Sequence, residues 1–217
     1  LSNDGMLFGL PTNENIGLHT FNVIAADKQG STTSIEINLS VGNNGLAADY
    51  WYNLSGTSVS TLKEYSKYPN EPDFSSSIET LDIESNSEKN NYGLRLHGYL
   101  TPENSGNYTF KISSDDESEL WISTNQSDSN KSLIASVPGY TNYQDFDKYS
   151  QQVSSNIELI AGQKYFIEVL LKQGTGSSHL TVMWEDENGN QEIIPNNILT
   201  KPEQATPSSN VNFDSEV

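Results

Sequence analysis

The chain has 217 residues, which is enough for one large β domain or for one domain with part of another. Eleven basic residues against 29 acidic ones give a formal net charge of −18, and Arg95 is the single arginine. A chain with no basic stripe is a poor partner for nucleic acid or for an anionic membrane surface. The absence of cysteine excludes a disulfide framework, a thiolate zinc site and a cysteine nucleophile.

The acidic balance has two interpretations. It keeps a protein soluble, and it also suits a salty medium rich in divalent cations, where carboxylates can hold those cations. No apolar run approaches the roughly 18 residues that span a bilayer, so membrane insertion is not expected. No signal peptide opens the chain, which begins mid-pattern at Leu1. We therefore expect a monomeric segment of a longer chain.

Composition predicts an all-β protein. The chain holds 11 tyrosines, 7 phenylalanines and 3 tryptophans, although only 34% of its residues are hydrophobic. Aromatic residues combined with abundant Ser, Thr and Asn favour β-strands with polar loops over disorder.

Residues 1–42 predict a small β unit. Two alternating runs, 20–27 and 33–41, flank a turn at 28–31 and have the pattern of a hairpin. Together with residues 11–17, this stretch resembles the closing strands of cadherin-like or immunoglobulin-like bacterial repeats. About 40 residues enclose little core alone. The unit is therefore expected to pack on its neighbour or to be completed by the tail or linker, residues 201–217.

After a linker-like break at residues 42–45, strands are predicted at short intervals from 46 to 200, with no long helical period. The predicted strands are 93–100, 106–113, 119–122, 157–159, 164–171 and 179–184. The last two are expected to form a facing pair across a turn at 174–176. The pattern indicates a β-sandwich or barrel.

Adjacent carboxylates lie at the end of the second of these strands. Asp115 and Asp116 form either a solvated acidic turn or part of a hard-cation site. Calcium takes six to eight oxygen ligands, so two carboxylates serve it only if a second loop adds more.

Residues 46–200 resemble a PA14 domain, a family named for the protective antigen of anthrax toxin. The matching segments are 97–102, 105–110, 114–116, 120–122, 157–168 and 172–180, closed by Trp184. The resemblance implies a PA14-type β-sandwich or barrel, flanked here by the small immunoglobulin-like fragment. The family occurs in toxins, glycosidases, yeast flocculins and bacterial adhesins.

The resemblance also implies a site. In lectin members, two successive aspartates joined by a cis peptide bind one calcium ion, and a vicinal diol of the sugar coordinates that ion. A second loop adds an amide side chain and alternate backbone carbonyls. Carried over, the aspartates are Asp115 and Asp116, the amide is Gln173, and the carbonyls belong to Thr175 and Ser177.

The second loop contributes further ligand-binding residues. Gly174 and Gly176 supply the freedom that lets alternate carbonyls turn toward one point. Ser178 and His179 complete the set, with His179 either a strand-start residue whose ring has a partner or a hydrogen-bond partner of the sugar. Many bacterial relatives have an acidic residue at the position of Gln173, so the relatives' choice of sugar does not transfer.

Aromatic side chains could also stack on a sugar. Trp121 and Trp184 alternate within apolar strands and are expected in the core, whereas Trp51 stays open. Tyr140 or Tyr143 is a candidate for the rim of the site. With three scattered histidines and no cysteine, zinc is not expected.

These observations predict a non-enzymatic, calcium-dependent carbohydrate-binding module of a large secreted bacterial adhesin, acting outside the cell or at the bacterial surface. The expected partners are cell-surface glycans of the fucose, glucose or mannose type. Two alternatives stay open, a structural spacer that calcium rigidifies and an accessory sugar-binding domain of a glycosidase. Pairs of carboxylates can always be drawn in a chain with 29 acids, so they decide nothing about glycoside hydrolysis.

Overall fold

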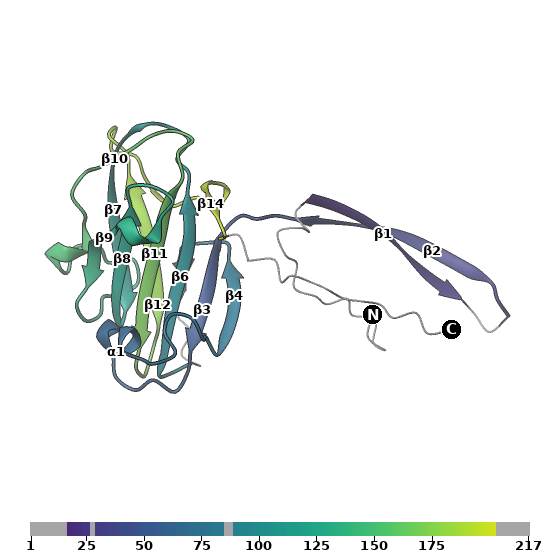
Figure 1. Cartoon of the computed structure of the whole chain (residues 1–217), viewed down its shortest axis with the longest axis horizontal. Helices are drawn as coiled ribbons and strands as arrows, with labels where there is room; N and C mark the ends of the chain where they lie inside the picture. Colours follow the sequence, from purple (N-terminus) through teal and green to yellow (C-terminus); the bar gives the residue numbers. More distant parts are fainter. Residues whose placement is uncertain (1–16, 27–28, 85–88, 203–217) are drawn as a thin grey trace. The chain divides into compact units, whose positions relative to one another are not determined.

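A computed structural model describes residues 17–26, 29–84 and 89–202 (Figure 1). They fall into two compact units, a hairpin that ends before Asn44 and a larger unit that spans Asn44–Pro202. The expectations for residues 1–16 and for a tail that completes the first unit lie outside the described residues. Within the described ranges, no helix has the length and apolarity needed to cross a membrane.

The first unit contains the predicted hairpin. Strand β1 (Gly17–Ala26) pairs antiparallel with β2 (Thr32–Val41). Directly opposed residues share a face, so the pairs Phe21–Ile37 and Val23–Ile35 form one apolar face. Alternation along both strands thus produces an amphipathic ribbon.

The second unit is built from two antiparallel sheets, which confirms the all-β prediction (Figure 1). The larger sheet has the order β4-β3-β6-β11-β8-β9, with β14 beside β6, and the smaller has the order β10-β7-β12-β13, with β5 beside β12. The larger sheet comprises β3 (Leu46–Trp51), β4 (Phe74–Ile78), β6 (Tyr92–Leu100), β8 (Glu117–Ser123), β9 (Lys131–Val137), β11 (Tyr165–Gln173) and β14 (Leu199–Thr200). The smaller comprises β5 (Asp82–Ile83), β7 (Gly106–Asp115), β10 (Ile157–Leu159), β12 (His179–Glu185) and β13 (Gln191–Ile193). Helix α1 (Val59–Lys63) and the short 3-10 helices Asp128–Asn130, Ser150–Gln152 and Asn196–Ile198 complete the unit.

The core lies between the two sheets. Alternate residues of β7 (Tyr108, Phe110 and Ile112) and of β11 (Ile167, Val169 and Leu171) are buried in one continuous hydrophobic cluster. Every residue of β11 is buried, because the outer face of its sheet is covered as well. Strand β11 is therefore buried on both faces, by the core on one side and by the segment that covers the larger sheet on the other.

The cover on that outer face is a small apolar cluster above a layer of charge. Trp51, Leu54 and Leu62 pack together on the segment that carries α1. Beneath them, the buried carboxylate of Glu168 accepts from Arg95 Nε at 2.6 Å and pairs with Lys131 Nζ at 2.8 Å. Two cations thus compensate one buried anion, as burial of a charge requires.

The last two predicted strands, 164–171 and 179–184, are expected from the sequence to pair with each other, and the structure shows that they do not. β11 pairs with β6 and β8 in the larger sheet, whereas β12 pairs with β7, β5 and β13 in the smaller one. The turn at 174–176 therefore crosses from sheet to sheet instead of closing a hairpin. Both runs are apolar and alternate, and such a pattern does not specify which strand is the neighbour.

The tryptophans divide in an unexpected way. Trp184 is buried as predicted, and Trp51, left open by the sequence, is fully buried. Trp121 is only half-buried, which corrects its assignment to the core. Its indole lies beneath Lys63 Nζ at 5.7 Å and donates to Glu119 Oε2, because on β8 its side chain alternates with the core residues Leu120 and Ile122.

Substitution of Leu96 tests the core assignment. Leu96 is fully buried in the main cluster, so Leu96→Ala is expected to lower the free energy of unfolding by about 3 kcal/mol. Urea unfolding followed by tryptophan fluorescence reports on this unit, since all three tryptophans lie in it. Leu133→Ala is the matched control, because Leu133 is 46% exposed and its loss should cost well under 1 kcal/mol. Equal losses for the two variants would contradict the assignment.

Candidate metal site

Two connections between the sheets meet at one end of the sandwich. The first carries Asp115 and Asp116 from β7 to β8, and the second, residues 174–178, leads from β11 to β12. Across each sheet the flanking residues are direct partners, His179 with Asp115 and Lys172 with Glu117. The backbone N–H of Gly174 donates to Asp116 Oδ2 at 2.9 Å, so the two predicted loops are in contact.

The aspartate pair is held from both sides. The Asp115–Asp116 peptide bond is cis, as the sequence comparison predicted. Ser114 Oγ donates to the backbone carbonyl of Asp116 at 2.7 Å, and Asp115 forms a backbone bridge with Tyr140. Both carboxylates are half-buried. Their positions are therefore set by neighbours on the chain and by an adjacent loop.

Burial, together with the nearby negative charge of Asp116, raises the pKa of Asp115 to about 6. The Lys148 ammonium acts in the opposite direction. Two carboxylates that repel each other in this way favour the binding of a cation between them.

The side-chain amide of Gln173 gives a second indication of a binding site. Its side chain is 0% exposed, and its Nε2 donates to the carbonyl of Ser177 at 2.9 Å. Its Oε1 is buried and has no hydrogen-bond partner. Buried polar atoms are nearly always satisfied, so this oxygen is suited to a ligand or an ion.

The second loop is shaped by backbone contacts. Gly176 has φ of +103°, a conformation that glycine adopts without strain, and its N–H donates to Asn90 Oδ1 at 3.0 Å. The carbonyl of Gly174 accepts from the backbone N–H of Asn91 at 2.6 Å. Thr175 and Ser177 are exposed. No sequence pattern indicates Asn90 and Asn91, because their contacts with the second loop span more than 80 residues of chain.

Ser178 and His179 lie behind this loop and are both buried. The Ser178 hydroxyl is 2.6 Å from the Tyr92 hydroxyl. His179 Nε2 is 3.1 Å from the carbonyl of Thr141, and its Nδ1 has no partner. Burial lowers the pKa of His179, so a neutral ring that donates from Nε2 is favoured. The observed ring contact agrees with the strand-start interpretation, and contact with a sugar stays a prediction.

Both loops at this end of the sandwich therefore carry hard oxygen donors. They are two carboxylates, one orphaned amide oxygen and exposed backbone carbonyls, which is the donor set that calcium prefers. Within the described ranges, no three His, Cys, Asp or Glu side chains gather closely enough to hold a metal ion without such neutral oxygens.

Exposed aromatic rings lie next to Asp115. Tyr140 is 56% exposed, and Lys148 Nζ lies 3.7 Å from the centre of its ring. Tyr143 is also exposed, donates to Asp82 Oδ2 at 2.8 Å and meets the ring of His179 edge-on. Both candidates for a rim are thus available at the surface.

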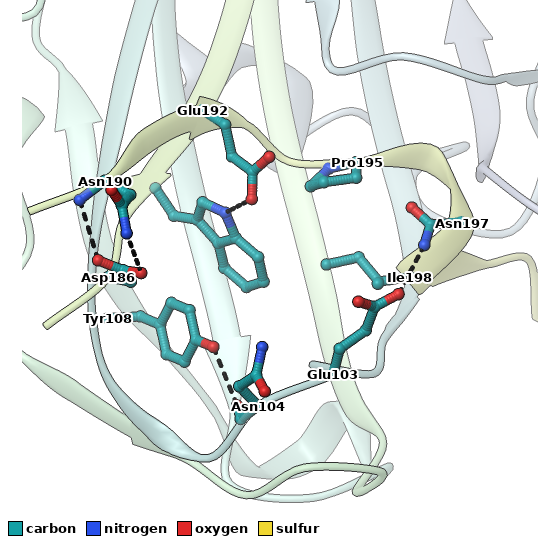
Figure 2. Close-up of a pocket in the computed structure, with 10 residues that line it drawn as sticks. Glu103, Asn104, Tyr108, Asp186, Asn190, Glu192, Pro195, Asn197 and Ile198 are labelled. Atoms are coloured by element: carbon teal, nitrogen blue, oxygen red, sulfur yellow. Dashed lines mark hydrogen bonds between the residues drawn. The ribbon is translucent and has the colours of Figure 1, made fainter. Parts of the chain in front are cut away.

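A hollow of about 190 Å³ lies at the other end of the sandwich and contains none of the predicted site residues (Figure 2). Tyr108, at its floor, is seven residues from Asp115 along β7, which is roughly 23 Å in a strand. Trp184 and Tyr108 stack there but are almost completely buried, so they offer no open ring face. Trp184 donates to Glu192, and Asn197 donates to Glu103. The hollow therefore offers few side chains that are free to recognise a ligand.

The raised pKa of Asp115 leads to a pH-dependent prediction. An unfolded aspartate has a pKa of about 3.9, so the folded protein holds this proton more tightly. The free energy of unfolding therefore falls as the pH rises from about 4, and this loss is complete above about 6. In calcium-free buffer, Asp115→Asn should raise Tm by a few degrees at pH 7 and leave it unchanged near pH 4. Glu158→Gln, which removes an exposed charge at the far end of β7, should show no such difference. Equal Tm values for wild type and Asp115→Asn at pH 7 would contradict the assignment.

Curated relatives match only parts of longer proteins. The mouse N-acetyl-beta-glucosaminyl-glycoprotein 4-beta-N-acetylgalactosaminyltransferase 1 is 39% identical over 99 residues, which is 43% of this chain and 10% of the transferase. The anti-sigma-I factor RsgI3 of Acetivibrio thermocellus is 30% identical over 128 residues, 57% of this chain and 17% of that protein. The chain thus spans less than a fifth of the length of these relatives.

Solved structures share the fold. A PA14 sugar-binding domain from an RTX adhesin superposes with a TM-score of 0.57 at 17% identity, over 73% of this chain and 99% of that one. The Epithelial Adhesin 6 A domain of Candida glabrata, solved with Galb1-3GlcNAc, gives 0.55 at 13% identity, over 77% and 91%. The sequence pattern of the PA14 domain matches residues 42–197, well over half of the protein, and the chain therefore belongs to the PA14 domain family.

Proposed function

We propose that this chain is a non-catalytic, calcium-dependent carbohydrate-binding module. The observation that carries the proposal is the contact of Gly174 with Asp116, which brings the aspartate pair together with the loop that follows the orphaned oxygen of Gln173. Carboxylate, amide and carbonyl oxygens converging on one place suit calcium better than any softer metal.

The residues of this chain would form a rigid coordination shell for the ion. Asp115 and Asp116 would supply charge, Gln173 Oε1 a neutral donor, and the carbonyls of Thr175 and Ser177 further oxygens. Bound calcium would supply open coordination positions for the adjacent hydroxyls of a sugar. Gln173 Nε2 already holds the Ser177 carbonyl, so the second loop would need little rearrangement to bind the ion.

The relatives support a glycan partner and an extracellular setting. One similar structure is a sugar-binding domain of an adhesin, and another is an adhesin domain in complex with Galb1-3GlcNAc. We therefore propose that the parent protein is a secreted or cell-surface bacterial adhesin. The proposed ligands are neutral glycans of the fucose, glucose or mannose type, because a chain with a net charge of −18 would repel an acidic glycan.

Removal of one carboxylate tests the calcium site. Asp115→Ala should abolish both calcium binding and sugar binding, because one charged ligand of a shared coordination shell is lost while the core is untouched. Titration calorimetry measures both affinities, and circular dichroism checks the fold. Glu158→Gln, an exposed change in charge, should bind calcium as the wild type does. Unchanged calcium affinity in Asp115→Ala would refute the site.

Free sugars test how the ligand is held. In calcium buffer, fucose, glucose or mannose should compete for an immobilised glycan with dissociation constants around millimolar, about −4 kcal/mol, since one ring offers few contacts. Sugars whose adjacent hydroxyls are deleted or blocked should compete much more weakly, and EDTA should abolish binding. If the blocked sugars compete as well as their parents, calcium does not hold a vicinal diol.

A further inference from the structure

Residues 53–58, here called the flanking loop, connect β3 to α1 and lie against both halves of the candidate metal site. We infer that the flanking loop forms a third wall of the glycan site and that Lys172 and Glu117 are positioning residues that hold it there. This inference rests on the proposed function, and it adds a specificity-determining element that no motif in the sequence indicates.

Lys172 ties the flanking loop to the second metal-site loop. Its side chain is 0% exposed, and its Nζ donates to the backbone carbonyls of Leu54 at 2.7 Å, Gly56 at 2.5 Å and Gln173 at 2.8 Å. All three donors of the ammonium group are thus used. Two of the three acceptors belong to the segment 54–56 and the third to the proposed calcium ligand Gln173, so one cation fixes both loops.

Glu117 ties the first residue of α1, which directly follows the flanking loop, to the first metal-site loop. It directly follows Asp116, and its Oε2 accepts from the backbone N–H of Val59 at 3.0 Å. Glu117 and Lys172 are direct cross-strand partners with opposite charges. Within the described ranges they form no ion pair with each other, although such pairs are favourable in sheets. Each instead binds the backbone of residues 54–59.

Close packing at Gly174 places the flanking loop beside the aspartates. A Cβ atom on Gly174 would lie 2.9 Å from the Thr57 methyl group, 3.3 Å from Asp116 Oδ2 and 3.4 Å from the Gly56 carbonyl. Only glycine fits between these groups. Thr57 is itself exposed, so its side chain, like the Asp116 carboxylate, lies beside Gly174 and also faces solvent.

The calcium ion and the flanking loop would therefore have different roles in sugar recognition. A sugar held by calcium through two hydroxyls exposes the rest of its ring to whatever surrounds the ion. Thr57 is one such neighbour, on a loop whose backbone is fixed by two charged groups. A fixed wall discriminates between sugars more sharply than a mobile one, because less ordering is needed on binding.

A matched pair of variants tests the tie. Glu117→Gln and Glu117→Ala remove the same charge beside the site, but only glutamine keeps an oxygen that can accept from Val59. At saturating calcium, Glu117→Ala should bind L-fucose, D-glucose or D-mannose about tenfold more weakly than Glu117→Gln, whereas their calcium affinities should agree within about twofold. Hydrogen exchange in residues 53–58 should rise in the alanine variant only. Equal sugar affinities and equal exchange in the two variants would overturn the inference.

Two further variants separate the roles of the wall and its anchors. Thr57→Trp should change the ranking of those three sugars while leaving calcium affinity unchanged, and an unchanged ranking would overturn the assignment of the wall. Lys172→Met should raise hydrogen exchange in residues 53–58 and weaken sugar binding, because the flanking loop loses its tie to Gln173, and unchanged exchange would overturn the anchoring role of Lys172. If Lys172→Met does not fold, the Glu117 pair decides.

Failure of the inference differs from failure of the proposed function. A wild-type protein that binds none of the three sugars in calcium overturns the proposed function and this inference with it. A wild-type protein that binds a sugar, with the Glu117 and Thr57 variants indistinguishable from it, overturns the inference alone.

Discussion

The site depends on two connections that cross between the sheets at the same end of the sandwich. Because β7 and β12 are partners in one sheet and β8 and β11 in the other, the chain has to change sheets twice within a small area. The backbone N–H of Gly174 then reaches the carboxylate of Asp116. Each of these two loops is held at both ends by strands of the packed sheets, which limits the positions that it can take. Pre-organisation of the donor oxygens follows from this topology.

The distribution of charge also distinguishes the end of the sandwich that carries Asp115 and Asp116. Within the part of the chain that the structure describes, the acidic residues other than Glu168 are partly or fully exposed, so water and salt screen their charges. Asp115 and Asp116, in contrast, form no ion pair within the described residues, although the charge of Lys148 acts on Asp115 and that of Lys172 on Asp116, and burial raises the pKa of Asp115. Glu168, deeper in the same sheet, is neutralised by Arg95 and Lys131. The chain thus gives the buried carboxylate of Glu168 two ion pairs, whereas the described residues give the aspartate pair none.

Buried charge also organises the outer face of the larger sheet. Lys172 is fully buried, and its hydrogen bonds go to backbone carbonyls instead of a carboxylate. Burial lowers its pKa to about 8, with the Asp116 carboxylate opposing this shift, so the ammonium remains charged near neutral pH. A buried cation of this kind imposes directions on the backbone that apolar packing cannot impose, because carbonyl groups must point at it. The apolar cluster of Trp51, Leu54 and Leu62 excludes water from this region.

The class of fold and the candidate site residues could be predicted from the sequence alone. Alternation along 106–113 and 179–184 located β7 and β12, and the match to the family pattern singled out the aspartate pair and Gln173. The sequence did not indicate α1, which has five residues and therefore no visible helical period. It paired β11 with β12 wrongly, because an apolar alternating run fits any neighbour. Only the tertiary structure decided that Lys172 is buried, that Trp121 lies on an outer face and that residues 53–58 border the aspartates. These features depend on contacts between residues more than 50 positions apart, and local propensity and periodicity carry no information about such contacts.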